Sequence, residues 1–411
     1  MNSRERVIAA INHRQPDRVP IDLGGTAASG INVNAYVRLK RLLGMTSNDV
    51  QVFDIFGMMA RVEQDVLDHF NVDTLLIPSL CPRFNIPIKD WKLWHLHDGT
   101  PVQVPVGFQT IEEKDGSLLL MVDGQAIGRM PRNDTYFLEL AETDMGGLDA
   151  LTDPPDPDTV TFSPLTDEDL RFRQEIAENL YQATDKALIV DLVDNIRWNT
   201  PIANWLFGMA ANPDRTFELH EKKGLNILEK AKQLAQAVGP YASVFAIYQD
   251  YGTQRAELIS PETFERLVMP HYRRVFDWIH QNTNWKVLFH SCGSIYRLIP
   301  QIVEMGVDIL NPIQTNATNM DPRRLKSEFG NRLVFWGGGV ETQTTLPSGT
   351  PEQVRQQVRE RISILGVGGG YVFAPTQDIQ ADVPPENLVA MYDAVQEYGG
   401  YPLEAAPNEL S

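Results

Sequence analysis

Short apolar runs recur along this chain, and most of them are unbroken instead of alternating with polar residues. Each run ends at polar residues, and helical patterns lie between the runs. Unbroken apolar runs are typical of parallel strands that are buried on both faces. The pattern therefore predicts eight strands, at residues 18–23, 73–78, 187–193, 243–248, 286–290, 308–311, 333–337 and 370–374.

The helical patterns carry start and stop signals. Residues 260–281 begin with Ser260 as a candidate N-cap and Pro261 at the first helical position, and we expect one helix there. A second helix is expected over residues 384–400, where Gly399 suits the C-terminal stop. Strands that alternate with helices eight times predict an α/β fold, a (β/α)8 TIM-type barrel.

About a hundred residues separate the second and third predicted strands. Within them, Asp115-Gly116 and Asp123-Gly124 stand between short β-type runs, which predicts a small β-hairpin insertion. Residues 151–170 are rich in Pro and Asp and are typical of a surface linker. We predict a single barrel domain over residues 1–411, with an excursion at 82–170 that holds the hairpin unit and the linker.

Composition narrows the function classes. A net charge of −18 argues against nucleic acid or an anionic membrane as the main partner. No run approaches the roughly 18 apolar residues of a membrane span. The first twenty residues lack the apolar core of a secretory signal, and two cysteines cannot form a framework of bridges. A reducing cytoplasm is the expected location.

Polar residues follow nearly every predicted strand. In a barrel of this kind the chemistry lies where the strands end. We expect about half of these residues to be helix caps or turn residues instead of functional groups. The candidates are Asp22, Ser79, Cys81, Asp191, Asp194, Asn195, Gln249, Asp250, Gln254, His290, Cys292, Asn311, Gln314, Glu341, Thr376, Gln377 and Asp378.

His290 and Cys292 follow the fifth strand, two positions apart. Alternation in an extended segment places both side chains on one side, toward the barrel mouth. Sulfur and imidazole nitrogen are ligands that Zn²⁺ prefers. Two ligands do not make a site, so a packed histidine beside a small buried thiol stays open as the other interpretation.

Five stretches, taken together and in order, resemble the uroporphyrinogen decarboxylase superfamily, which includes corrinoid-linked methyltransferases on the same barrel. They cover residues 4–31, 252–280, 290–314, 333–358 and 369–399. In the methyltransferase branch, H-x-C after one strand and a further cysteine late in the barrel bind Zn²⁺. His290 and Cys292 match the first part, but Gln377 stands near the late position. Asp250, Glu341 or Asp378 would complete a modified shell.

The resemblance also implies a reaction, in which a methyl group moves between a small methylated ether, amine or thiol and a corrinoid. Asp250 and His290 would be catalytic, and His290, Cys292 and Gln377 would bind the metal. The chain has no D-x-H-x-x-G segment, so the corrinoid would arrive on a partner protein. Superfamily members are often dimers, and a homodimer is expected. The implied substrate-binding residues are Asp22, Asp250, Gln254, Asn311, Glu341 and Gln377.

The decarboxylase branch implies a different chemistry. It binds an anionic tetrapyrrole with arginines near its N-terminus, whereas residues 22–30 hold no basic cluster. The alternative to the methyltransferase is therefore a metal-free decarboxylase, another lyase, or a ligand-binding protein on the same scaffold. In that alternative, Asp250 is a general base or hydrogen-bond acceptor and His290 a general acid.

Overall fold

The structure is a computed structural model that describes residues 1–45, 49–140, 151–198 and 200–403. Within these ranges, seven parallel strands form one sheet in the order β15-β14-β13-β12-β11-β10-β3. Each strand overlaps a predicted run. Their bounds are β3 Thr74–Ile77, β10 Ala187–Leu192, β11 Ala242–Tyr248, β12 Lys286–His290, β13 Ile309–Asn311, β14 Val334–Trp336 and β15 Tyr371–Val372.

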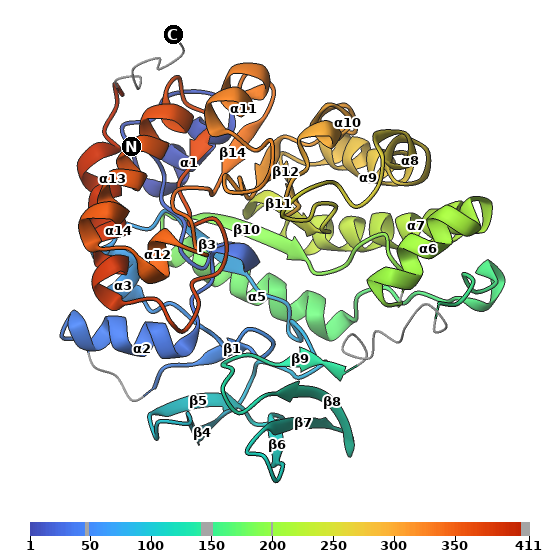
Figure 1. Cartoon of the computed structure of the whole chain (residues 1–411), viewed down its shortest axis with the longest axis horizontal. Coiled ribbons are helices and arrows are strands. Elements are labelled where there is room, and N and C mark those ends of the chain that lie inside the picture. The colour runs from blue at the N-terminus through green and yellow to red at the C-terminus, as the bar shows by residue number, and fades with distance from the viewer. Residues whose placement is uncertain (46–48, 141–150, 199, 404–411) are drawn as a thin grey trace.

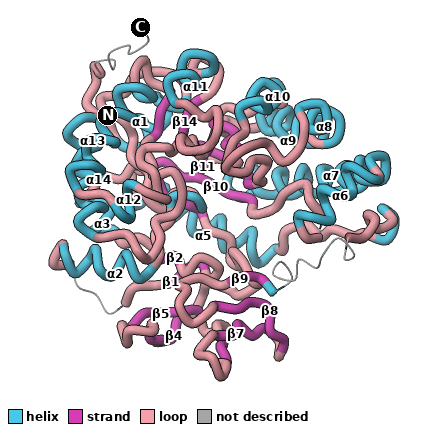
Figure 2. Tube along the Cα trace, in the orientation of Figure 1, coloured by secondary structure: helices cyan, strands magenta, loops and turns pink. Residues whose placement is uncertain are grey.

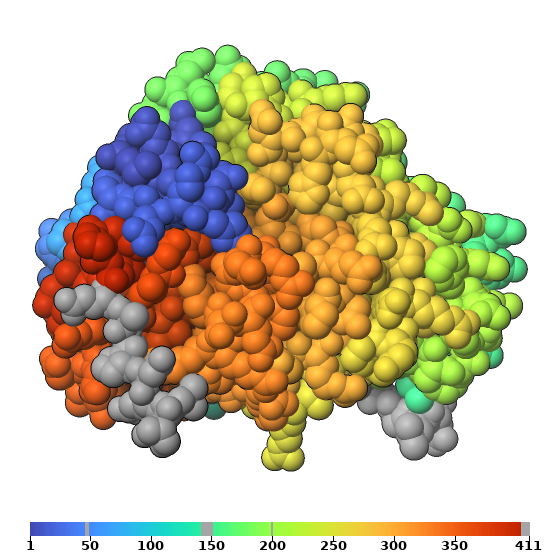
Figure 3. Space-filling view, turned by 90° about the horizontal axis from the view of Figure 1, so that it is seen from above, coloured from blue at the N-terminus to red at the C-terminus, as the bar shows by residue number. Residues whose placement is uncertain are grey.

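Residues 20–22 close this sheet into a barrel. Ile21 forms a parallel bridge with Phe373 beside β15, and the backbone N–H of Asp73 donates to the carbonyl of Ile21 beside β3. The first predicted strand thus occupies the eighth position, between the two outer strands of the sheet. Figure 3 shows the N-terminal residues in blue packed against the C-terminal residues in red, as this closure requires. The predicted TIM-type barrel is confirmed.

Helices surround the barrel strands (Figures 1 and 2). The Ser260 side chain caps α8 by accepting from the N–H of Thr263, as the sequence predicts. The single helix expected over 260–281 is wrong, because the chain divides at Val268 into α8 and α9. Pro270 lies in the first turn of α9, and a proline ring cannot continue the preceding helix. The helices are α1 Ser3–Ile11, α2 Val33–Leu42, α3 Gln64–His69, α5 Asp167–Ala183, α6 Ile202–Ala211, α7 Pro213–Val238, α8 Pro261–Leu267, α9 Met269–Asn282, α10 Ile299–Glu304, α11 Pro322–Phe329, α12 Thr345–Ser348, α13 Pro351–Arg361 and α14 Pro385–Tyr398.

The barrel interior is a separate apolar cluster made by alternate residues of the strands. It includes Ile189, Ala246, Leu288 and Ile309, and residues of α1 pack against it. The backbone of Arg4 in α1 donates to Asp185, just before β10, so α1 covers the N-terminal ends of the strands. The other end of the barrel is left for the site. Side chains two positions apart on a strand face the same way, so the residues two positions after these four also face the barrel axis. They are Asp191, Tyr248, His290 and Asn311.

The insertion between β3 and β10 consists of two small antiparallel sheets (Figure 1). Asp123 and Gly124 both have positive φ, at 51° and 78°, and form the tight turn between β7 and β8, as the Asp-Gly signal predicts. The sheets flank β1 Val52–Asp54, which pairs with β2 Met59–Ala60. Their strands are β4 Trp91–His95 with β5 Pro101–Pro105, and β6 Gln109–Glu112 with β7 Leu118–Val122, β8 Gln125–Met130 and β9 Leu138–Glu139.

The predicted linker is shorter than expected. Helix α5 begins at Asp167, capped by the Thr166 hydroxyl, so residues 167–170 are helical and the expected end at 170 is wrong. Residues 141–150 of the excursion lie outside the described residues. The division into one domain at 1–411 with an excursion at 82–170 stays a prediction. Among the helices described, none is both long and apolar enough to cross a membrane.

Candidate active site

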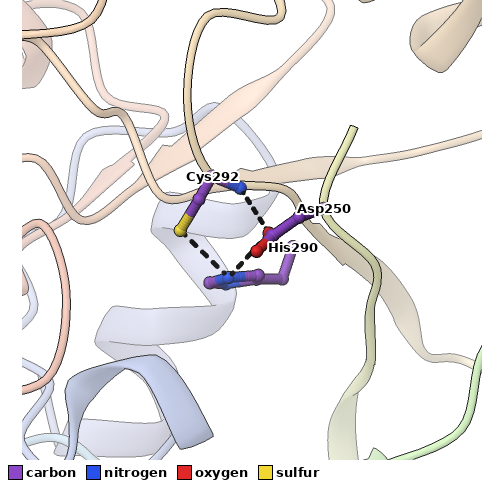
Figure 4. A group of neighbouring side chains, drawn as sticks. All are labelled: Asp250, His290 and Cys292. Carbon is purple, nitrogen blue, oxygen red and sulfur yellow. Dashed lines mark hydrogen bonds and ion pairs between the residues drawn. The ribbon is translucent and has the colours of Figure 1, made fainter. Parts of the chain in front are cut away.

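Asp250, His290 and Cys292 converge at the C-terminal ends of two adjacent strands. Tyr248 of β11 is in register with His290 of β12, so the residues that follow the two strands leave the sheet side by side. The Cys292 Sγ lies 3.4 Å from the His290 Nε2, and the Asp250 Oδ1 lies 3.7 Å from the same nitrogen (Figure 4). One ligand atom from each residue lies within 4.8 Å of the other two.

A backbone hydrogen bond also fixes the position of the Asp250 carboxylate. Its Oδ1 accepts a hydrogen bond of 2.8 Å from the backbone N–H of Cys292 (Figure 4). The carboxylate is half-exposed, whereas the His290 ring is buried. The cluster therefore has an open side toward solvent and a closed side toward the barrel. A catalytic metal site has this form, because one coordination position has to stay accessible to substrate.

Asn311 sets the tautomer of His290. The Asn311 Nδ2 donates to the backbone carbonyl of Trp336 at 3.0 Å, which turns the amide oxygen toward His290. That oxygen lies 2.7 Å from the His290 Nδ1, so Nδ1 carries the proton. The Nε2 lone pair is then left facing Cys292 and Asp250. A carbonyl oxygen behind the imidazole is the usual arrangement for a histidine that ligates a metal.

Gln377 lies against the thiol. Its Nε2 donates to the Cys292 Sγ at 3.1 Å, and its Oε1 is buried and has no hydrogen-bond partner among the described residues. Burial raises the pKa of the Cys292 thiol above its ordinary value, and the charges of Asp250 and Asp378 add to this effect. The thiol is thus protonated in the absence of a nearby cation.

A pocket of about 170 Å³ opens beside the cluster. Glu341 lines it and is held in place, since its Oε2 accepts from the Thr344 hydroxyl at 2.9 Å and its Oε1 lies 3.4 Å from the Arg361 guanidinium. Because Cys292 belongs both to this pocket and to the donor cluster, a ligand in the pocket meets the sulfur. The lining residues are Cys292, Gln314, Asn316, Glu341, Thr342, Gln343, Thr376 and Gln377.

Four of the six predicted substrate-binding residues do not line this pocket: Asp22, Asp250, Gln254 and Asn311. Asp22 is fully buried and accepts hydrogen bonds from Thr74, Trp336 and the backbone of Gly25. Gln254 accepts from the Gln314 side chain at 2.7 Å and braces the loop after β13. Asn311 lies behind His290. The substrate-binding roles predicted for these residues stay predictions.

Tyr248 also lies at this site, although it was not among the predicted site residues. Its ring centroid lies 5.3 Å from that of His290, and its hydroxyl accepts from the backbone N–H of Ala27. The signal was present, because Val244 and Ala246 face the barrel interior and Tyr248 continues their period of two. However, a tyrosine within an apolar run is ordinarily interpreted as an aromatic residue of the core.

Known proteins resemble this chain in family and in fold. The family model "Uroporphyrinogen decarboxylase (URO-D)" matches residues 199–398. A methylated-thiol–coenzyme M methyltransferase from Methanosarcina mazei is 27% identical over 149 residues, which are 34% of this chain and 38% of that protein. A uroporphyrinogen decarboxylase from Psychromonas ingrahamii is 36% identical over 78 residues, 19% of this chain and 21% of that protein. The matches thus span about two fifths of these relatives or less.

A solved structure extends the likeness to the whole chain. A methyltransferase from Methanosarcina mazei superposes with a TM-score of 0.59 at 14% sequence identity, covering 97% of this chain and 99% of that one. At that identity the superposition supports the fold alone. The comparisons thus support a member of the uroporphyrinogen decarboxylase superfamily, matched over residues 199–398, that resembles the methyltransferase branch.

Proposed function

We propose that this chain is a methyltransferase that moves a methyl group between a small methylated ether, amine or thiol and a corrinoid carried by a partner protein. A zinc ion held at Asp250, His290 and Cys292 would assist the transfer. The observation that carries this proposal is the convergence of one sulfur, one imidazole nitrogen and one carboxylate oxygen within 4.8 Å, at the open end of a barrel. The likeness to a methylated-thiol–coenzyme M methyltransferase supports the reaction class.

The donor set fits zinc. Cys, His and Asp side chains supply the S, N and O ligands that this ion takes, and tetrahedral sites need four donors. The fourth is either Gln377 or the substrate. Within the part of the chain that the structure describes, the buried Gln377 Oε1 has no hydrogen-bond partner, and turning the amide would bring that oxygen to the side now held by Nε2. When bound, zinc would act as a Lewis acid on the heteroatom that carries the methyl group.

The protein's own residues would then place the substrate. The Asn311 amide holds the His290 ring, and the Cys292 backbone holds the Asp250 carboxylate, so the cluster is preorganised. The pocket receives the body of the substrate with its heteroatom at Cys292. The open side of the mouth stays free for the partner. The cytoplasmic location and the homodimer remain predictions.

Metal content and methyl transfer test the proposal together. We expect about one zinc per chain in the purified protein, and methyl transfer between a small thiol or thioether and an added corrinoid. Cys292→Ala should lose both. Cys81→Ala is the matched control. Cys81 is the other cysteine of the chain, follows β3, and belongs to neither the donor cluster nor the pocket. Full zinc content in Cys292→Ala would remove this residue from the metal site.

A carboxy-lyase is the second candidate, because uroporphyrinogen decarboxylases recur among the relatives. On this reading Asp250 would act as general base and His290 as general acid without metal. The carboxylates of Asp250 and Asp378 beside Cys292 oppose the binding of a polyanionic substrate. Carboxyl release by protein stripped of metal would favour this candidate.

A further inference from the structure

The pocket at the barrel mouth has a wall made mostly of uncharged polar side chains. Asn316 follows β13, Gln343 follows β14 and Gln377 follows β15, and all three line the pocket. Among the described residues of the lining, Glu341 alone is charged, and the buried Arg361 guanidinium lies 3.4 Å from its Oε1. The charge of Glu341 is thus balanced from behind, so the described wall offers no free charge to an ionic ligand.

Asn316 contributes an acceptor oxygen to this wall. Its Nδ2 donates to the Gln343 Oε1 at 2.8 Å, whereas its Oδ1 is buried and has no hydrogen-bond partner in the described ranges. A buried acceptor that receives no donor costs free energy, and a ligand that brings an O–H or N–H group would recover it. The Gln377 Oε1 is unpartnered within the same ranges, but it is a candidate ligand for zinc. Asn316 is therefore the lining residue that a donor on the substrate would meet.

A chain of side-chain amides holds Asn316 in place. The Gln314 Oε1 accepts from the backbone N–H of Gly293 at 2.7 Å, and the Gln314 Nε2 donates to the Gln254 Oε1 at 2.7 Å. The Gln254 Nε2 then donates to the backbone carbonyl of Asn316 at 2.9 Å. A backbone N–H can only donate and a backbone carbonyl can only accept, so the two ends of the chain fix the orientation of both glutamines. The loops after β11, β12 and β13 are thereby joined, and this part of the wall is preorganised.

These features favour an uncharged ligand that carries a hydrogen-bond donor. In the described residues, the group that could hold a metal ion is Asp250, His290 and Cys292, and it lies beside this wall. An anion would meet Glu341 and no lysine or arginine among the described lining residues. A cation would have to compete with Arg361 for Glu341. The pocket volume of about 170 Å³ is below the range of about 300–1,000 Å³ that is typical for drug-sized ligands, so the ligand is small.

We propose that the substrate is a small, uncharged methylated thiol or ether that also carries a hydroxyl group, which donates to the Asn316 Oδ1. This inference rests on the proposed function, because the heteroatom of the same substrate would lie at Cys292, in the lining of the same pocket. The hydroxyl group takes no part in the transfer. The bond between methyl carbon and heteroatom breaks with its electron pair left on the heteroatom, and the reduced corrinoid on the partner supplies the pair for the new bond to carbon. Asn316 thus determines specificity and is not catalytic.

Three thiols, standing for the demethylated substrate, test this directly. 2-Mercaptoethanol carries the hydroxyl group, 2-methoxyethanethiol has it capped by a methyl group, and 1-propanethiol has a methyl group in its place. Their dissociation constants are measured by calorimetric titration of the zinc-loaded protein. A site built to bind a hydroxyl group rejects analogues that lack it, so 2-mercaptoethanol should bind about tenfold or more tighter than either analogue. Equal or tighter binding of either analogue would overturn the inference.

Substitutions of Asn316 separate the hydrogen bond from differences in hydration among the thiols. Asn316→Leu has a similar shape without the amide oxygen, so the preference for 2-mercaptoethanol should fall by about tenfold. Asn316→Asp keeps an acceptor and should keep the preference, as should Asn282→Leu at the exposed end of α9. A preference that is unchanged in Asn316→Leu would also overturn the inference. The wild-type series decides the question by itself if the leucine variant does not fold.

A sulfur-free pair distinguishes failure of this inference from failure of the proposed function. 1,2-Ethanediol and 1,2-dimethoxyethane need no metal, so ligand-detected NMR compares their binding to protein stripped of zinc. Preference for the diol that is lost in Asn316→Leu supports the hydroxyl site even if no zinc binds and no methyl group is transferred, in which case the proposed function alone fails. Methyl transfer by the zinc-loaded protein, with no preference for the diol or for 2-mercaptoethanol, would leave the methyltransferase standing and overturn the hydroxyl site.

Discussion

Gly252 and Gly293 lie with their backbones in direct contact. A Cβ built on Gly293 would stand 2.5 Å from the carbonyl carbon of Gly252, and one built on Gly252 would stand 2.6 Å from the carbonyl oxygen of Cys292. Gly293 also has a φ of 86°, which side chains rarely adopt. This contact joins the loops after β11 and β12. It is what brings Asp250 within reach of Cys292.

Gly252→Ala should therefore weaken zinc binding without removing a ligand. The added methyl pushes the Cys292 backbone away and lengthens its hydrogen bond to Asp250. We expect affinity to fall by about 10- to 100-fold, as for other supports of metal ligands. Competition with a chelator measures this. Gly400→Ala is the control and should bind normally, because a Cβ there meets no atom of the described residues within 4 Å. Unchanged affinity in Gly252→Ala would show that the loop contact does not position the ligands.

Asn311 is expected to act through His290. Asn311→Leu removes the acceptor at Nδ1 and frees the ring to turn or change tautomer, so zinc affinity should fall by about 10- to 100-fold. Asn311→Asp keeps an acceptor at the same place and should retain binding. The metal dissociation constants of the two variants, measured side by side, test this. A leucine variant that binds zinc as tightly as the aspartate variant would contradict the role.

Asp22 is predicted to matter for stability. Asp22→Ala leaves the Trp336 Nε1–H, the Thr74 hydroxyl and the Gly25 N–H without their acceptor inside the barrel. Each buried donor left unpaired costs about 1–3 kcal/mol, so we expect the free energy of unfolding to fall by about 3–5 kcal/mol. Urea unfolding followed by circular dichroism measures the loss. An alanine variant as stable as wild type would show that these donors find other partners.

His271 should make the fold sensitive to acid. It is 2% exposed, neither ring nitrogen has a hydrogen-bond partner in the described ranges of the chain, and burial lowers its pKa to about 4. Its neighbour His220 has a pKa lowered to about 3, again chiefly by burial. The unfolded chain takes up these protons near pH 6.5 and the folded chain does not. Stability is therefore lost as the pH falls from about 6.5 toward 4, by up to about 1.4 kcal/mol per pH unit for each histidine.

Replacing the ring isolates this effect. His271→Phe keeps an aromatic side chain against Phe217, whose ring centroid lies 4.6 Å away, and removes the titrating group. Urea unfolding between pH 7 and pH 4.5 should show a shallower loss of stability in the variant. Parallel curves for variant and wild type would mean that other groups set the acid sensitivity.

The barrel could be predicted from the sequence because its strands are buried on both faces. Runs such as residues 243–248 are almost entirely apolar, so they are easily identified as buried strands. Eight such strands predict a closed barrel, and closure requires the contact of Ile21 with Phe373. The shared side of His290 and Cys292 was also predictable, because a period of two is a local property of extended chain.

The remainder of the site depends on contacts between distant residues. The residues next to Asp250 in sequence do not indicate that Gly293 packs nearby. The residues next to Asn311 do not indicate that the Trp336 carbonyl orients the Asn311 amide. The helix division at Val268 was missed because the apolar spacing continues through it. Asp22 was placed correctly at a strand end, but its bonding to Thr74 and Trp336 is decided across the barrel.

X-ray absorption at the zinc edge of the purified protein tests the central claim most directly. The account predicts a shell with one sulfur at about 2.3 Å and nitrogen or oxygen ligands at about 2.0–2.2 Å, including one imidazole. In Cys292→Ser the sulfur contribution should disappear, and in Cys81→Ser it should stay. A protein without metal after zinc loading, or a zinc shell that contains no sulfur, would contradict the claim that Asp250, His290 and Cys292 form the metal site.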